Sequence, residues 1–203
     1  MSPLDPRRTV FVDIDTQVDF VEPTGALYVP AAETLKNNLA MLIRSAGARG
    51  VPIVASADAH GQDDPEFAIF PPHCVAGTPG QKRIAETEPE RARVIALGAP
   101  APAALEPGVT VVIEKVKFDL FTNPAAGAVI RASGATTAVV FGVALDYCVR
   151  AAALGLRDRG YETIVARDAT APVTAEGGAK AEVELRNAGV RFASTAEVVA
   201  ALG

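Results

Sequence analysis

TAVVFGVALDYCVRAAALGLRDRG, residues 137–160, joins a run of apolar, β-branched residues to a segment with helical periodicity. The run Thr137–Phe141 has the length and composition of a buried parallel strand. From Val149 to Leu156, apolar residues recur at i, i+3, i+4 and i+7, which is the pattern of an amphipathic helix. Cys148 therefore stands at a strand-to-helix turn, where backbone N–H groups and the helix dipole favour a thiolate. This position suits a nucleophile and suits a buried, inert cysteine equally well.

The same alternation extends along the whole chain. Six strands are expected: Thr9–Ile14, Pro52–Ala57, Val109–Glu114, Thr137–Phe141, Glu162–Ala166 and Val190–Ala193. Helices are expected from Leu35 to a C-terminal Gly50 and at Pro124–Ser133, Tyr147–Asp158, Ala175–Asn187 and Thr195–Leu202. Strands that alternate with helices predict a three-layer α/β/α fold of Rossmann type, with a mainly parallel, roughly six-stranded sheet. Ligands of such sheets bind beyond the carboxyl ends of the strands.

The chain length of 203 residues suits one domain over residues 1–203, and no repeat or linker divides it. Residues 60–108 are the exception to the alternation, because they hold eight of the fifteen prolines and show little periodicity outside a possible short helix near Gln81–Glu86. A long irregular segment inside a compact domain is more often functional than accidental. This segment contains both histidines of the protein.

Composition excludes several classes of function. A net charge of −5 gives no electrostatic basis for binding nucleic acid or an anionic membrane. No apolar run is long enough to span a bilayer, and the first residues, MSPLDPRRTVF, show no signal-peptide pattern. Two cysteines do not form the disulfide framework of a small secreted protein. We therefore expect a reduced, cytoplasmic protein.

Charged residues stand at the ends of two other expected strands. Asp15 follows the first strand, with Asp19 four residues later, and Lys115 and Lys117 follow the third. Taken singly, a loop-capping carboxylate and a solvated lysine explain these residues at least as well as catalysis does. A parallel sheet, however, brings these strand ends to one edge, together with Cys148. An acid, an amine and a thiol in one cleft make a nucleophile with a base and a cation to tune it.

The segment SADAH, followed by PPHC, offers a possible metal site. Asp58 and His60 are two residues apart at the end of the second strand, and His73 follows thirteen residues later. One carboxylate and two imidazoles suit a divalent ion with open coordination positions. By spacing alone, a turn-capping Asp58 and two hydrogen-bonding histidines remain an equal alternative.

Taken together, these motifs resemble the isochorismatase-like cysteine hydrolases, and within them the nicotinamidase branch. The resemblance rests on DTQVDF (Asp15–Phe20), SADAH, FPPHCVAGTPG (Phe70–Gly80), the first lysine of KVKFDLF, and GVALDYC, in the order of the family. It implies the isochorismatase-like hydrolase fold and a cysteine amidohydrolase activity. The acid of the family corresponds to Asp15 and not to Asp13, because Asp15 is the one followed by x-Gln-x-Asp-Phe.

The resemblance also implies the other catalytic positions. The lysine of the family corresponds to Lys115, six residues before Phe121, and its nucleophile corresponds to Cys148. The family has a cis peptide that would lie here between Val143 and Ala144. The N–H groups of Ala144 and Cys148 would then face the oxyanion of the reaction.

The nicotinamidase branch binds a divalent ion through an Asp, a His and the His of the His-Cys pair. These ligands correspond to Asp58, His60 and His73. A further His or carboxylate often completes the set, and here Glu66 occupies the matching place, with Asp63 and Asp64 as competitors. A carboxylate at this place would favour manganese or iron over zinc, so zinc, manganese and iron all remain candidates. We expect Cys74, next to His73, to serve in packing.

The resemblance predicts hydrolysis of a small carboxamide, best nicotinamide to nicotinate and ammonia, through a thioester on Cys148. Phe20, Phe70 and Tyr147 would flank the ring of the substrate. A metal-independent amidase acting on a carbamoyl, maleamate or ureido compound is the first alternative. A non-catalytic or redox protein with Cys148 as a sensor thiol is the second, although such a protein does not need Asp15. The expected partner is a small-molecule amide, and the family commonly forms homo-oligomers.

Overall fold

The computed structural model describes residues 1–203, and its centre is one parallel sheet of seven strands. In chain order the strands are β1 (Thr9–Ile14), β2 (Ile53–Asp58), β3 (Ala92–Ile95), β4 (Thr110–Lys115), β5 (Thr137–Val143), β6 (Glu162–Ala171) and β7 (Arg191–Ala193). Their order across the sheet is β3-β4-β2-β1-β5-β6-β7, and every neighbouring pair is parallel. The predicted α/β class with a parallel sheet is confirmed.

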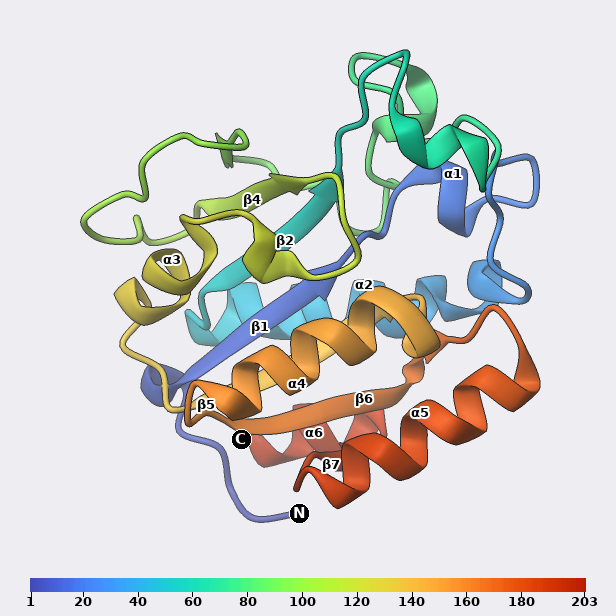
Figure 1. The fold of residues 1–203 in the computed structure, drawn as a ribbon. Helices are drawn as coiled ribbons and strands as arrows, with labels where there is room; N and C mark the ends of the chain where they lie inside the picture. The colour runs from blue at the N-terminus through green and yellow to red at the C-terminus, as the bar shows by residue number, and fades with distance from the viewer.

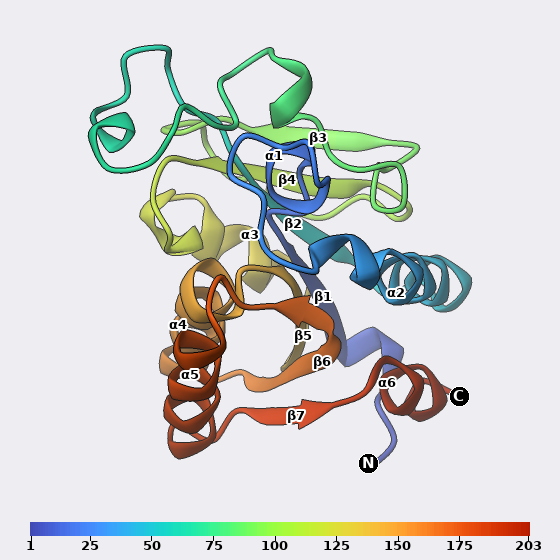
Figure 2. The same cartoon turned by 90° about the vertical axis from the view of Figure 1, so that its right-hand side faces the viewer.

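Helices cover both faces of this sheet (Figure 1). One face packs against α3 (Ala126–Ala132), α4 (Arg150–Asp158) and α5 (Ala175–Asn187). The other packs against α2 (Lys36–Arg49) and α6 (Thr195–Ala201). Figure 2 shows the sheet between these two layers. None of the helices combines the length and the hydropathy needed to cross a lipid bilayer.

The alternation of side chains along the strands explains why two cores form. In β1, every residue is buried, since its alternate side chains face the two helical layers. Val10 and Val12 belong to the core under α3, α4 and α5, whereas Phe11 belongs to the core under α2 and α6. The chain reverses its direction across the sheet between β1 and β5, which makes the carboxyl ends of these strands a topological switch point.

The prediction of six strands was one strand too few, because β3 lies inside the segment expected to be irregular. β3 is a short strand at the edge of the sheet, and Ile95 is its one buried residue. Such a strand shows too little hydrophobic patterning to be recognised. The short helix expected near Gln81–Glu86 is absent. A single 3₁₀ turn at Pro79–Gln81 is the only helical structure in this part of the chain.

A buried ion pair attaches the long segment after β2 to the sheet. Arg83 pairs with Asp13 of β1 and also donates to the Ser56 carbonyl oxygen at 3.2 Å. Thr16 and Thr87 hydrogen-bond to each other at 2.7 Å beside this pair. Asp13 is therefore occupied in anchoring the segment, which leaves Asp15 as the candidate for the reactive carboxylate.

Close packing of β1 against β5 fixes the backbone at the switch point. Gly142 pairs in register with Ile14 and has a φ of +107°. A Cβ at Gly142 would overlap the main-chain oxygen of Ile14. Glycine is therefore required here for both its conformation and its size, and the close contact brings Asp15 next to the chain that leads to Cys148.

Candidate active site

Asp15 is the first residue after β1 and is completely buried. Its backbone has a φ of +49°, which turns the chain sharply at the end of the strand. Its Oδ1 accepts a hydrogen bond from the Ser56 hydroxyl at 2.6 Å. Its Oδ2 lies 2.8 Å from Lys115 Nζ, in an ion pair that lacks the alignment of a hydrogen bond. No sequence pattern predicts the Ser56 contact, because Ser56 is far from Asp15 in the chain.

Lys115 ends β4 and stands in register with Asp58, which ends β2. Its ammonium group donates to Asp58 Oδ1 at 2.6 Å and lies 3.7 Å from Cys148 Sγ. The side chain is fully buried. Lys117, the other lysine of the motif, is 56% exposed and lies 3.7 Å from Glu66 Oε2. Lys115, and not Lys117, therefore meets Asp15 and Cys148.

Cys148 lies in a π-helical turn, Leu145–Val149, that leads directly into α4. Its side chain is buried beside Lys115, and it lines the same cavity as Asp15. The peptide bond between Val143 and Ala144 is cis. The turn thus begins one residue after the cis bond.

The pKa values of the two carboxylates, Asp15 and Asp58, are shifted in opposite directions. Burial raises the pKa of Asp15, against the lowering effect of the Lys115 ammonium. Burial acts on Asp58 as well, but Lys115 and His60 hold the pKa of Asp58 below its usual range. Although burial favours the neutral amine, Asp15 and Asp58 raise the pKa of Lys115 well above its usual value. Of the two carboxylates, Asp15 is therefore the one that accepts a proton more readily.

Burial also affects the pKa of the Cys148 thiol. It raises the pKa of the Cys148 thiol well above its usual value, and the Lys115 ammonium opposes this rise without cancelling it. At this position, burial therefore opposes the field at the start of a helix, which by itself favours a thiolate. A thiol in this position requires a neighbouring base to become a nucleophile.

Gln17 fixes the backbone of Asp58. Its amide oxygen accepts from the Asp58 N–H at 2.7 Å, and its amide nitrogen donates to the Asp58 carbonyl oxygen at 2.8 Å. The same nitrogen donates to the Gln81 carbonyl oxygen at 2.8 Å. The glutamine of DTQVDF therefore connects β2 to the loop that carries the histidines, a role that its place in the motif did not reveal.

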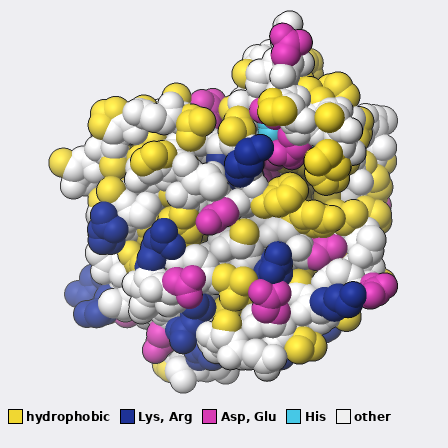
Figure 3. Space-filling view, in the orientation of Figure 1, with side chains coloured by type: hydrophobic (Ala, Val, Ile, Leu, Met, Phe, Trp, Pro, Cys, Tyr) yellow, Lys and Arg dark blue, Asp and Glu magenta, His cyan; other side chains and the backbone are white.

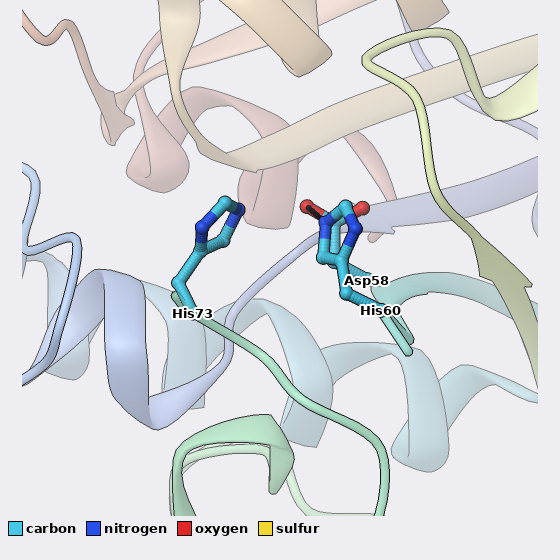
Figure 4. Close-up of side chains that lie close together, drawn as sticks. All are labelled: Asp58, His60 and His73. Carbon is cyan, nitrogen blue, oxygen red and sulfur yellow. Dashed lines mark ion pairs between the residues drawn. The ribbon is translucent and has the colours of Figure 1, made fainter. Parts of the chain in front are cut away.

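Asp58, His60 and His73 form a buried cluster whose potential ligand atoms lie within 4.8 Å of one another. Figure 4 shows the three side chains, two from the end of β2 and one from the following loop, directed toward a common space. His60 Nε2 is buried, has no hydrogen-bond partner, and lies 3.8 Å from Asp58 Oδ2. His73 shares its Nδ1 proton with the Pro71 carbonyl oxygen at 2.8 Å, which leaves its Nε2 free.

These donors fit a divalent ion. An unpartnered, buried imidazole nitrogen next to a carboxylate is costly unless another group binds it. One carboxylate and two imidazoles are the ligands that zinc and related ions prefer. Glu66 approaches the cluster, with its Oε1 4.0 Å from His73 Nε2. Asp64 instead contacts His60 Nδ1 at 3.0 Å and forms a second group of potential ligand atoms with His60 and Glu66. Asp63 is exposed and belongs to neither group.

Cys74, the neighbour of His73, is buried in the core under α2. Burial raises the pKa of its thiol far above the usual value. Its backbone N–H donates to Asp19 Oδ2 at 2.7 Å. Cys74 therefore serves in packing, and Asp19 holds the backbone of the histidine loop.

One cavity of about 90 Å³ joins the catalytic group to the metal-ligand cluster. Its lining residues are Asp15, Phe20, Leu27, Tyr28, Val29, Asp58, Glu66, Phe70, His73, Phe118, Val143, Ala144, Tyr147, Cys148 and Val173. This volume is far below the roughly 300–1,000 Å³ of pockets for drug-sized ligands, so a small substrate fits best. A larger hollow of about 760 Å³ between β6, α5 and α6 contains none of the catalytic or metal-binding candidates.

Aromatic rings form one wall of this cavity. Phe20, Phe70 and Tyr147, the three residues expected to flank a ring, all line it. Phe118 joins two of them, since its ring centroid lies 6.3 Å from that of Phe70 and 5.1 Å from that of Tyr147. Tyr28 completes the lining from the segment after α1 (Val18–Val21). In Figure 3 a small part of a histidine is visible between basic, acidic and hydrophobic side chains, although both histidines are almost completely buried.

The Isochorismatase domain family matches residues 9–97 and 99–197 of the chain. The chain belongs to the isochorismatase family. The membership predicted from the motifs is thus confirmed, and the match includes all seven strands of the sheet.

Several proteins are similar to this isochorismatase-family chain. Nicotinamidase of Saccharomyces cerevisiae is 24% identical over 199 residues, which cover 82% of this chain and 89% of that protein. Pyrazinamidase of Pyrococcus horikoshii, solved in complex with zinc, is 26% identical, with a TM-score of 0.77 and coverage of 92% and 99%. N-carbamoylsarcosine amidase from Thermoplasma acidophilum is 25% identical, with a TM-score of 0.75 and coverage of 93% and 96%.

Proposed function

We propose that the protein is a metal-dependent cysteine hydrolase of a small, neutral aromatic carboxamide, with nicotinamide as the best candidate. One observation carries this proposal: Asp15 and Cys148, both within 4 Å of the buried Lys115 ammonium, line a cavity that also has an aromatic wall and side chains that could bind a metal. The similarity to a nicotinamidase and to a pyrazinamidase supports the same substrate class.

In the proposed reaction, Asp15 accepts the proton of the Cys148 thiol and the thiolate attacks the amide carbon. Lys115 stabilises the negative charge that is shared between the two groups, since its ammonium lies within 4 Å of both. The carbon–nitrogen bond then breaks, and Asp15 returns its proton to the departing ammonia. Water, deprotonated by Asp15, hydrolyses the thioester and regenerates the thiol.

The oxyanion of each tetrahedral intermediate would be stabilised by the N–H groups of Ala144 and Cys148. Both residues line the cavity. Backbone N–H groups that already point toward the developing charge are among the strongest sources of catalysis, because they need no reorganisation.

Asp58, His60, Glu66 and His73 would hold the divalent ion. Such an ion supplies an electron-pair acceptor for a ring nitrogen of the substrate. Phe20, Phe70 and Tyr147 would hold the ring between the ion and the nucleophile. Zinc, manganese and iron are all compatible with two imidazoles and two carboxylates.

The charges of the cavity favour a neutral amide over an acidic one. Asp15, Asp58 and Glu66 line it, and none of the lining side chains is Arg or Lys. A substrate that carries its own carboxylate, such as maleamate or a ureido acid, would lack a basic side chain to bind it. The metal-independent amidase is the second candidate, supported by the similarity to N-carbamoylsarcosine amidase.

A redox role for Cys148 has less support. Sensor thiols are exposed and have a low pKa. The Cys148 residue is 7% exposed, and burial raises the pKa of its thiol.

Ammonia release from a panel of amides tests the proposal. We expect turnover of nicotinamide and pyrazinamide, little turnover of maleamate and N-carbamoylsarcosine, and loss of activity on treatment with a chelator. Cys148→Ala should abolish turnover, with Cys74→Ala as the control that retains it. Full activity in chelator would eliminate the role of the metal, and full activity of Cys148→Ala would eliminate the thioester.

A further inference from the structure

The Asp64 carboxylate connects two candidate metal ligands without belonging to the cluster of Asp58, His60 and His73. Its Oδ2 lies 3.0 Å from His60 Nδ1, and its Oδ1 accepts from the Glu66 N–H at 2.9 Å. Asp64 is the N-cap of the 3₁₀ turn Pro65–Ala68, so its own backbone is held in place. Its side chain is 10% exposed, and the imidazole that it contacts is 1% exposed.

This contact determines which nitrogen of His60 carries the proton. A carboxylate accepts hydrogen bonds, so Nδ1 next to Asp64 is the nitrogen that donates. The lone pair of the neutral ring is then on Nε2, which is buried, has no hydrogen-bond partner, and faces Asp58 at 3.8 Å. Metal-binding histidines are commonly oriented in this way by a carboxylate on the other ring nitrogen.

We propose that Asp64 is a positioning residue that holds His60 in the Nδ1–H tautomer and thereby directs Nε2 at the metal. Because the same carboxylate binds the Glu66 N–H, it also fixes the start of the turn that carries Glu66. Asp64 also forms a second group of potential ligand atoms with His60 and Glu66, but we assign it a positioning role because its Oδ2 contacts His60 Nδ1 and its Oδ1 accepts from the Glu66 N–H. The inference deepens the proposed function and rests on it for the catalytic consequence.

Asp64→Asn is the informative substitution. Asparagine is as good an N-cap as aspartate, so its carbonyl oxygen continues to accept the Glu66 N–H. Its NH₂ group then faces His60 Nδ1 and can only donate, which moves the ring proton to Nε2. The same Asp-to-Asn change reverses the tautomer of the catalytic histidine in serine proteases. Asp63→Asn is the matched control, since it removes the same charge one residue earlier from an exposed side chain.

The tautomer can be measured directly by ¹⁵N–¹H correlation NMR of the imidazoles in the metal-free protein. The chain has two histidines, so both rings can be assigned. At a pH high enough for both rings to be neutral, we expect Nδ1–H for both rings in the wild type. In Asp64→Asn, His60 should change to Nε2–H while His73, bonded to Pro71, does not change. An Nε2–H tautomer of His60 in the wild type, or no change in Asp64→Asn, would overturn the inference.

The affinity for Zn²⁺, measured by competition with a chromogenic chelator, is the second readout. We expect Asp64→Asn to bind about 10–100-fold more weakly and Asp63→Asn to bind like the wild type. Equal losses in the two variants would mean that total charge, and not the orientation of His60, determines affinity. The NMR measurement needs neither metal nor substrate, so it can fail while amide hydrolysis stands, and hydrolysis can fail while the tautomer result stands.

Discussion

Lys115→Met removes a fully buried ammonium group and leaves two carboxylates without their cation. The ammonium lies 2.8 Å from Asp15 Oδ2 and 2.6 Å from Asp58 Oδ1. Removal of one partner from a buried ion pair costs about 3–5 kcal/mol, because the remaining charge stays buried. Lys117→Met removes the same charge from a side chain that is 56% exposed and 3.7 Å from Glu66. Because the lysine of this pair is exposed to solvent, the pair contributes about 0–1 kcal/mol.

Urea unfolding followed by circular dichroism measures the free energy of unfolding of both variants. We expect a loss of about 3–5 kcal/mol for Lys115→Met and less than about 1 kcal/mol for Lys117→Met. The double variant Asp58→Asn/Lys115→Met should recover part of the loss, since it removes one of the two unpaired charges. Equal losses for the two lysine variants, or no recovery in the double variant, would refute the electrostatic account of the site.

Three further expectations concern the base, the switch point and the aromatic wall. Burial raises the pKa of Asp15, and the proposed base must be ionised. As the pH decreases, kcat/KM should therefore begin to fall at a pH above the ordinary Asp pKa of about 3.9. An acidic limb of the pH profile at or below about pH 3.9 would contradict the role of Asp15 as the base. Gly142→Ala should lower the unfolding free energy by about 3 kcal/mol or more, whereas Gly47→Ala, in the last turn of α2 with open space around it, should raise it by up to about 1 kcal/mol, as measured by thermal unfolding. Phe118→Ala should raise KM for ring-bearing amides by about 2–10-fold and leave KM for a small acyclic amide unchanged, since its ring contacts contribute about 0.5–1.5 kcal/mol.

The parts of the fold that follow from local pattern were predictable. The central strands are buried on both faces, so their continuous apolar runs identified them, and Gly50 ends α2 with a φ of +66° as expected. The edge strand β3 was missed, because pairing with β4 and not hydrophobic content makes it a strand. β6 continues to Ala171, beyond its predicted end, through a polar stretch that pairs with the end of β5.

The site was predictable to the extent that parallel strands bring their carboxyl ends together. Lys115 ends one such strand and Asp15 and Cys148 follow two others, so topology alone places them close to one another. The contact from Ser56 and the orientation of His60 by Asp64 were not predictable, because they depend on loop conformation and on side-chain direction. Phe118 stood in a recognised motif, but that it lines the cavity was apparent only once the fold was known.

Asp58 belongs both to the catalytic group and to the candidate metal site, and this double role has a consequence for how the family can evolve. One of its oxygens pairs with Lys115, and the other faces His60. A lineage that gave up the metal could replace His60, Glu66 or His73 without disturbing the nucleophile. Replacement of Asp58 would at the same time remove one of the two counterions of Lys115. We therefore expect descendants of this chain that work without metal to keep the aspartate and to lose the histidines first.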